Sequence, residues 1–238
     1  MRKNPAGQDR PAVLLDLDNT ILDFDMAERT ALSRAFDLLG VPYNDAMLKL
    51  YNAINLRHWE MLEDGILTRE QVLVKRFEAL FTECGVKANA FATQENYERL
   101  LSEGHWFLPG APELLESLFG SYRLFLCSNG SQLVQEGRIK SAGIAPYFEG
   151  IFISEHMGAN KPEKAYFDLC FAQIPGFDRK RTIMVGDSLT SDIRGGRNAG
   201  VLTCWFNPSG KPRRKGIEPD YEIESLEQIP TVLSACFK

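Results

Sequence analysis

Side chains that could share one chemical task are spread along this chain, most of them directly after short apolar runs. They are three aspartates, a serine, an asparagine and a lysine on a later loop: Asp16, Asp18, Ser128, Asn129, Lys161 and Asp187. Short apolar runs that end in turn residues are typical of strands buried on both faces of a parallel sheet. Such sheets bind ligands beyond the carboxyl ends of their strands, so we expect these side chains to converge.

This set of groups suits phosphoryl chemistry at a metal ion. Three carboxylates in one cleft repel one another, and a hard divalent cation with oxygen ligands, most simply Mg²⁺, relieves that repulsion. A lysine and a hydroxyl nearby would bind a phosphoryl group that also contacts the metal. An aspartate or serine after one strand is common as a turn former or helix cap, but four such positions in order favour a site.

Strands and helices alternate over most of the chain. Apolar runs predict strands, and helical periodicity predicts helices between them; the strands are 12–15, 122–127, 151–153, 182–185 and 201–206, and the helices 112–119, 131–142, 163–172 and 191–199. Strands that alternate with helices of this length imply βαβ crossovers. We therefore predict an α/β fold with a doubly wound, Rossmann-like parallel sheet as its core.

Residues 23–102 have a different pattern. Apolar residues recur there at helical spacing, with no strand between them, over 27–39, 45–63, 68–84 and 91–101. Thr68 followed by Gln71 fits a capping box at the start of the third helix. We expect two domains, an α/β core of residues 1–22 and 103–238 and an all-helical cap of residues 23–102 inserted after the first strand.

The composition indicates a globular protein. Of the 238 residues, 44% are hydrophobic and 25% charged, and 27 basic against 32 acidic residues give a net charge of −5, which argues against nucleic-acid binding. No apolar run approaches the ~18–20 residues that would span a membrane. The five cysteines form no C-x-x-C pair and no apolar signal core precedes the first strand, so we expect reduced thiols in a cytoplasmic protein. The sequence leaves the oligomeric state open.

The motifs resemble those of a known superfamily. Residues 16–20 (DLDNT), Ser128, Lys161 with Pro162, and Gly186-Asp187 with Asp192 are similar to the four motifs of the haloacid dehalogenase (HAD) superfamily, in the right order. The likeness spans residues 12 to 206. The helical insert falls between the first and second motifs, which resembles the C1 cap of the phosphatase branch.

The resemblance implies that Asp16 is a nucleophile that forms an aspartyl-phosphate and that Asp18 is a general acid and base. Dehalogenases of this superfamily lack an aspartate at the second position, because halide leaves without a proton. Asp18 therefore favours phosphate esters over carbon–halogen bonds. A non-catalytic binding domain is a further alternative, but it predicts the loss of at least one motif residue, and Asp16, Asp18, Lys161 and Asp187 are all present.

The same resemblance implies roles for the surrounding groups. The phosphoryl oxygens would be bound by Ser128, Asn129 and Lys161. A Mg²⁺ ion would be held by the carboxylates of Asp16 and Asp187 and by the main-chain carbonyl of Asp18. Thr20 would hold the loop, and Asp192 would support the metal or Lys161.

The substrate class is inferred from similarity to particular families within the superfamily. Three segments resemble house-cleaning pyrimidine 5′-nucleotidases: residues 16–25, the cap segment around Trp59 with residues 64–68, and residues 198–207. This resemblance implies a nucleoside monophosphate as the small-molecule substrate. The N-acylneuraminate-9-phosphatases share the pattern at 186–189 and 195–200, so a sugar phosphate or another small organic phosphate is the alternative. Phe24, Asn55 and Trp59 are candidate specificity residues in the cap; Trp59 could stack on a base or pack in the cap interior.

Overall fold

The computed structural model describes residues 9–238, which form a six-stranded sheet in the order β3-β2-β1-β4-β5-β6. The strands, all parallel to their neighbours, are β1 (Ala12–Leu15), β2 (Arg123–Ser128), β3 (Gly150–Ile153), β4 (Thr182–Gly186), β5 (Leu202–Phe206) and β6 (Tyr221–Ile223). Every residue of the central strands β1, β2 and β4 is buried. The predicted α/β fold is confirmed, and β6 is an additional edge strand.

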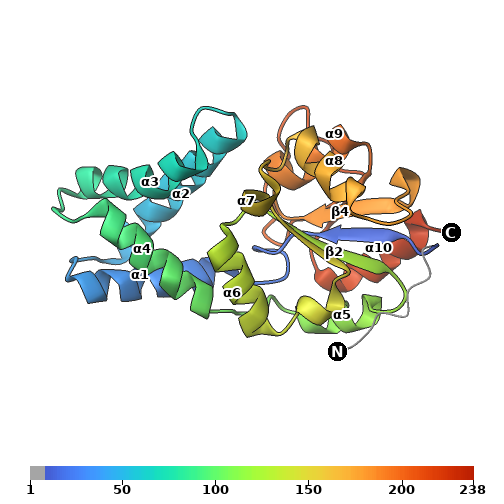
Figure 1. Cartoon of the computed structure of the whole chain (residues 1–238), viewed down its shortest axis with the longest axis horizontal. Coiled ribbons are helices and arrows are strands. Elements are labelled where there is room, and N and C mark those ends of the chain that lie inside the picture. Colours follow the sequence, from blue (N-terminus) through green and yellow to red (C-terminus); the bar gives the residue numbers. More distant parts are fainter. Residues whose placement is uncertain (1–8) are drawn as a thin grey trace.

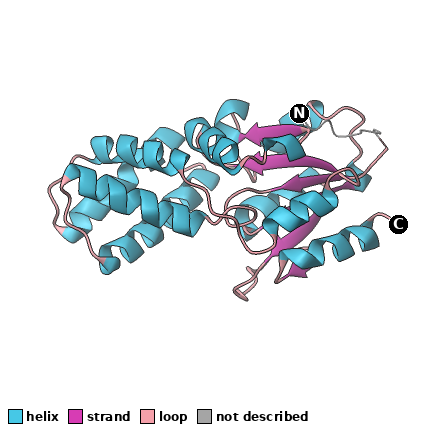
Figure 2. Ribbon diagram, turned by 90° about the horizontal axis from the view of Figure 1, so that it is seen from below, coloured by secondary structure: helices cyan, strands magenta, loops and turns pink. Residues whose placement is uncertain are grey.

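Helices cover both faces of the sheet (Figures 1 and 2). Alternate residues of β1 show why: Val13 and Leu15 pack with α5 (Ala111–Leu118), α6 (Gln132–Ala142) and α10 (Ile229–Cys236), whereas Leu14 packs with α8 (Lys164–Ala172) and α9 (Arg194–Ala199). The short helices are α7 (Ser154–Met157), η1 (Ala145–Tyr147), η2 (Arg179–Arg181) and η4 (Leu226–Gln228).

The predicted helix at 191–199 is two elements. A π-helical turn, η3 (Leu189–Ile193), precedes α9. It begins earlier than predicted because the Ser188 side chain accepts a hydrogen bond from the main-chain N–H of Ser191 and so caps the turn. Helix α9 is short because it begins only after this turn and ends at Ala199, where Gly200 caps it with a left-handed backbone (φ 73°).

A separate helical bundle lies beside the carboxyl ends of the strands (Figures 1 and 2). It consists of α1 (Phe24–Leu39), α2 (Asp45–Glu63), α3 (Arg69–Cys84) and α4 (Ala90–Glu103), which pack around their own apolar core. Thr68 and Gln71 form the predicted capping box at the start of α3. The helices therefore agree with the sequence periodicity to within about one turn.

A buried polar network crosses the centre of this bundle. Asn55 donates to Glu28 (2.7 Å) and accepts a hydrogen bond from Arg76 (2.8 Å), and Arg76 also donates to Gln94 (2.8 Å). All four side chains are buried. Asn55, a predicted specificity residue, therefore lies in the interior of the bundle with both ends of its amide used by neighbouring helices.

Glu28 gives this network a pH dependence. Burial raises the pKa of Glu28 to about 7, although the positive charge of Arg76 acts to lower it. The ordinary pKa of a glutamate is about 4.3. At pH values between about 4.3 and about 7, Glu28 therefore keeps a proton in the folded protein that it has lost in the unfolded chain, so the free energy of unfolding falls as pH rises. We expect the stability of Glu28→Gln relative to wild type to rise by up to about 1.4 kcal/mol per pH unit between pH 5 and 7.

Urea unfolding at three pH values in this window measures the effect. The exposed Glu95→Gln on α4 is the matched control and should change the unfolding free energy little at any pH. A difference between Glu28→Gln and wild type that stays constant over the window would contradict the prediction.

The remaining sequence expectations concern thiols and membranes. None of the five cysteines forms a disulfide, and Cys127, Cys170 and Cys204 are buried. No helix within residues 9–238 is both long enough and apolar enough to cross a bilayer.

Candidate active site

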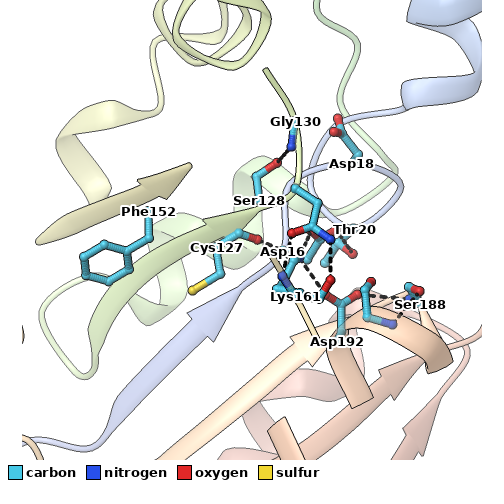
Figure 3. A network of polar contacts seen from close by, with 12 residues as sticks. Asp16, Asp18, Thr20, Cys127, Ser128, Gly130, Phe152, Lys161, Ser188 and Asp192 are labelled. Carbon is cyan, nitrogen blue, oxygen red and sulfur yellow. Dashed lines mark hydrogen bonds and ion pairs between the residues drawn. The ribbon is translucent and has the colours of Figure 1, made fainter. Parts of the chain in front are cut away.

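Asp16 is at the centre of a polar cluster beyond the carboxyl end of β1 (Figure 3). Its carboxylate accepts hydrogen bonds from Lys161 Nζ (2.7 Å) and Thr20 Oγ1 (3.1 Å), and only 5% of the residue is exposed. Its main-chain N–H donates to the carbonyl of Val185 on β4 (2.9 Å). One carboxylate oxygen therefore faces an ammonium group and the other a hydroxyl.

Lys161 reaches this cluster from the loop between α7 and α8 and is 1% exposed. Its Nζ donates to Asp16 (2.7 Å), to Asp192 (2.6 Å) and to the carbonyl of Cys127 (2.9 Å), which uses all three ammonium hydrogens. The Asn129 amide donates to the main-chain carbonyl of Lys161 and accepts from its N–H, both at 2.8 Å. Asn129 thus fixes the Lys161 backbone, and its contact with phosphoryl oxygens stays a prediction.

Replacing Lys161 with methionine should therefore destabilise the fold. The variant leaves two buried carboxylates facing each other without the ammonium group between them, and breaking a buried pair of this kind costs about 3–5 kcal/mol. Urea unfolding in the presence of EDTA measures the loss. Lys164→Met, whose side chain is exposed and pairs with Asp168, is the control and should cost no more than about 1 kcal/mol. Equal losses in the two variants would contradict the assigned geometry.

Carboxylates of three residues gather beside Lys161. Oxygens of Asp16, Asp187 and Asp192 lie within 4.8 Å of one another. Asp192 is fully buried, and its second oxygen accepts a hydrogen bond from the Ser188 N–H (3.0 Å). A Cβ on Gly186 would lie 2.2 Å from this oxygen, so only glycine lets Asp192 approach β4 so closely.

The cluster holds more negative than positive charge. Burial raises the pKa of Asp16 to about 7 and that of Asp187 well above its usual range, and the neighbouring carboxylates add to both shifts. Burial alone would lower the pKa of Lys161, but the charges of Asp16 and Asp192 outweigh burial and raise it. Lys161 pairs with Asp16 and Asp192, and Asp187 pairs with the exposed Lys211 (3.7 Å). Because the three carboxylates outnumber these two ammonium groups, this oxygen-rich donor set fits a hard divalent cation.

Asp18 is oriented differently from Asp16. Its carboxylate points away from Asp16 in Figure 3 and accepts hydrogen bonds from Gln135 Nε2 (2.6 Å) and from Arg138, both on α6. The side chain is 27% exposed, whereas that of Arg138 is fully buried. Neither Gln135 nor Arg138 was among the predicted site residues. Their three-residue spacing on the helix after Ser128, which puts them on one face, was the available signal.

The turn after Asp18 explains how the chain leaves the sheet for the bundle. Asn19 has a left-handed backbone (φ 58°), a conformation that asparagine adopts more readily than most residues. Its side chain accepts a hydrogen bond from the Phe24 N–H (2.9 Å) and donates to Asp25 (3.0 Å). The asparagine therefore joins the loop after β1 to the first turn of α1.

Ser128 ends β2 and is buried. Its hydroxyl oxygen accepts hydrogen bonds from the Gly130 N–H (3.2 Å) and from Gln135 Nε2 (2.5 Å). Thr20 is also buried and donates to Asp16. The cluster thus unites the predicted residues from three strand ends and the Lys161 loop.

A profile of haloacid dehalogenase-like hydrolases matches residues 11–200. The chain belongs to this family. Among the relatives of this HAD hydrolase, the pyrimidine 5′-nucleotidase PynA of Streptococcus pneumoniae is 36% identical, covering 91% of this chain and 92% of PynA. The pyrimidine 5′-nucleotidase YjjG of Escherichia coli is 33% identical, covering 93% and 96%.

A solved structure is also similar to this HAD hydrolase. The HAD-hydrolase YfnB of Bacillus subtilis, described as bound to magnesium, has a TM-score of 0.90 at 40% identity, covering 94% of this chain and 98% of YfnB. The superfamily resemblance inferred from the motifs is therefore confirmed, as is the expectation of an enzyme.

In this HAD hydrolase Trp59 packs on Arg69, whose guanidinium carbon lies 5.6 Å from the ring centre. Arg69, the first residue of α3, donates to the carbonyl of Asn129 (3.0 Å) and to Ser154 and Asn160 (2.5 Å each). Arg69 therefore joins the helical bundle to the loop after β2, to the first residue of α7 and to the loop between α7 and α8. No motif or periodicity in the sequence predicts this contact.

Phe24, another predicted specificity residue, lies at the start of α1 with its ring 5.4 Å from the guanidinium carbon of Arg138. It is partly buried. Both aromatic candidates thus contact an arginine at the boundary between the helical bundle and the sheet domain.

Proposed function

We propose that this hydrolase cleaves phosphomonoesters through an aspartyl-phosphate on Asp16 and that its substrates are nucleoside 5′-monophosphates, pyrimidine nucleotides above all. The observation that carries the proposal is the setting of Asp16, buried between Lys161 and Thr20 with Asp18 two residues further along. A carboxylate so placed can attack an electrophile while a lysine neutralises the charge that the electrophile brings.

In the first step an oxygen of the Asp16 carboxylate attacks phosphorus, and the bond between phosphorus and the ester oxygen breaks. Protonated Asp18 gives its proton to that oxygen, and the alcohol leaves. In the second step Asp18 takes a proton from water as the water oxygen attacks phosphorus. The bond to Asp16 then breaks, which releases inorganic phosphate and restores both side chains.

The surrounding residues bind and orient the phosphoryl group in this mechanism. Lys161 faces Asp16 and offsets the negative charge of the phosphoryl oxygens, and the Ser128 hydroxyl donates to one of them. Asn129 acts on this step through Lys161, because its amide fixes the lysine backbone.

Mg²⁺ is the cofactor that this site would take. Asp16, Asp187 and the main-chain carbonyl of Asp18 would hold the ion, which when bound supplies positive charge to the phosphoryl oxygens. Asp192 would serve as a support, since its two oxygens already accept hydrogen bonds from Lys161 and the Ser188 N–H. The description of YfnB as bound to magnesium supports this assignment.

The substrate class rests on PynA and YjjG, both named as pyrimidine 5′-nucleotidases. The substrate is a small phosphate ester enclosed between a core of residues 1–22 and 103–238 and a cap of residues 23–102. The cap contacts the leaving group, while the core contacts the phosphoryl group.

Phosphate release from a panel of esters tests the proposal. The panel contains UMP, dUMP, dTMP, AMP, GMP, N-acetylneuraminate 9-phosphate, phosphoglycolate and hexose phosphates, each with Mg²⁺ and with EDTA. We expect the pyrimidine monophosphates to be the best substrates and EDTA to abolish turnover. Preference for a sugar phosphate would overturn the substrate and keep the mechanism, whereas no release from any ester would overturn the function.

A further inference from the structure

Gln135 contacts two residues of the proposed mechanism at once. Its Nε2 group donates one hydrogen bond to Asp18 Oδ2 (2.6 Å) and one to Ser128 Oγ (2.5 Å), which uses both amide hydrogens. Asp18 follows β1 and Ser128 ends β2, so a single amide on α6 joins the ends of two strands. The Gln135 side chain is 1% exposed.

Arg138 fixes the orientation of this amide. It donates to Gln135 Oε1 (3.4 Å) and also to the second oxygen of Asp18, Oδ1. Asp18 is its only acidic partner among residues 9–238, where its Nε and Nη2 groups make no hydrogen bond. A buried arginine is costly unless it is paired, and the polar partners of this one are Asp18 and Gln135, while the Phe24 ring packs on its guanidinium (5.4 Å).

The hydrogen bonds at Ser128 determine where its hydroxyl hydrogen can go. The oxygen accepts from both Gly130 N and Gln135 Nε2, and a hydroxyl oxygen has two lone pairs. Its own hydrogen therefore points away from both donors and is free for an acceptor such as a phosphoryl oxygen. Gln135 thus makes Ser128 a donor.

The local backbone is shaped to admit Gln135. A Cβ on Gly130 would lie 2.4 Å from the Gln135 side chain, far inside van der Waals contact. A side chain at position 130 would therefore push the amide away from Ser128. The glycine is required for this contact rather than for an unusual backbone angle.

We propose that Gln135, oriented by Arg138, is a positioning residue that sets both the proton donor Asp18 and the phosphoryl-binding hydroxyl of Ser128. The proposal rests on the phosphatase function proposed above. It gives α6 a double effect: on departure of the leaving group through Asp18 and on binding of the phosphoryl group through Ser128.

Two esters, UMP and p-nitrophenyl phosphate, and one ligand, inorganic phosphate, distinguish the effect through Asp18 from the effect through Ser128. Gln135→Met should lower kcat for UMP by about ten- to a hundredfold, the size of effect seen when a supporting partner of an active-site group is lost. The fall should be smaller for p-nitrophenyl phosphate, because p-nitrophenolate leaves without a proton and needs less of Asp18. Inorganic phosphate should bind several-fold more weakly, because Ser128 is no longer oriented.

Double variants and a matched control separate positioning from structural damage. In an Asp18→Asn background Gln135→Met should add little to the loss of leaving-group protonation on UMP, because that effect acts through Asp18, whereas the weaker phosphate binding, which acts through Ser128, should persist. Arg138→Lys, which keeps the charge, should retain more activity than Arg138→Met. Gln132→Met on the same helix, where the side-chain amide contacts Glu136, should leave both esters unaffected.

Two results would overturn the positioning role of Gln135. Equal losses on both esters with unchanged phosphate binding, or no loss at all, would overturn the positioning role while leaving the phosphatase function intact. A wild-type protein that hydrolyses no ester would overturn both. If Gln135→Met does not fold, Gly130→Ala displaces the same amide and should produce the same selective loss on UMP.

Discussion

Asp16→Asn should lower kcat for every ester in the panel by at least about four orders of magnitude, because an amide cannot replace the carboxylate as the attacking group. The fold should survive the change. Asparagine has the same shape as aspartate, and Lys161 keeps its contacts with Asp192 and the Cys127 carbonyl. Removing a carboxylate from a cluster with surplus negative charge also relieves repulsion.

Phosphate release and urea unfolding, measured on the same preparation, test this expectation. Asp23→Asn is the matched control, since Asp23 caps α1 through the Met26 N–H and asparagine caps a helix equally well. It should retain wild-type turnover. A folded Asp16→Asn protein within tenfold of wild type would show that the nucleophile is another group.

Asp18→Asn should lower turnover of an alkyl phosphate such as UMP by about two to four orders of magnitude, the effect of losing general acid–base help. The fall on p-nitrophenyl phosphate should be much smaller, because its leaving group is stable as an anion. Phosphate binding should persist, since the proposed contacts come from Ser128 and Lys161. Steady-state kinetics on the two esters, with phosphate as a competitive inhibitor, measure all three effects.

The contact between Asp18 and Arg138 makes a stability measurement necessary in that experiment. Asp18 neutralises the buried guanidinium of Arg138, so its replacement also removes a charge partner. The unfolding free energy must be measured beside the kinetics, and only a folded variant tests the chemistry. Equal losses on the two esters would mean that Asp18 is not the acid. Chloride release from a 2-haloacid by the wild type would favour the dehalogenase alternative.

Local patterns in the sequence were enough to predict the elements that carry the cluster. The apolar run before Asp16 predicts a buried strand because its four residues are too few for a helix and turn formers follow them. Thr68 and Gln71 predict the start of α3 through a capping box, which depends only on neighbouring residues. The strand β6 was missed because it has only three residues and forms one edge of the sheet.

The contacts that local patterns did not predict join residues far apart in the chain. Asn129 meets the Lys161 backbone, Gln135 meets Asp18, and Arg69 meets Asn160. Each depends on how two helices or loops pack, and no periodicity or spacing within one segment encodes that. The role expected for Asn129 followed from the superfamily resemblance, and those for Asn55 and Trp59 from residue type. The structure gives each of the three a protein partner.

Arg69 limits how this enzyme could exchange one helical domain for another. Its hydrogen bond to the Asn129 carbonyl extends, through the Asn129 amide, to the backbone of Lys161 beside Asp16. A helical domain taken from another protein would leave this chain of contacts incomplete unless the first turn of its third helix carried an equivalent donor. Exchange of the helical domain therefore depends on an arginine at the position of Arg69.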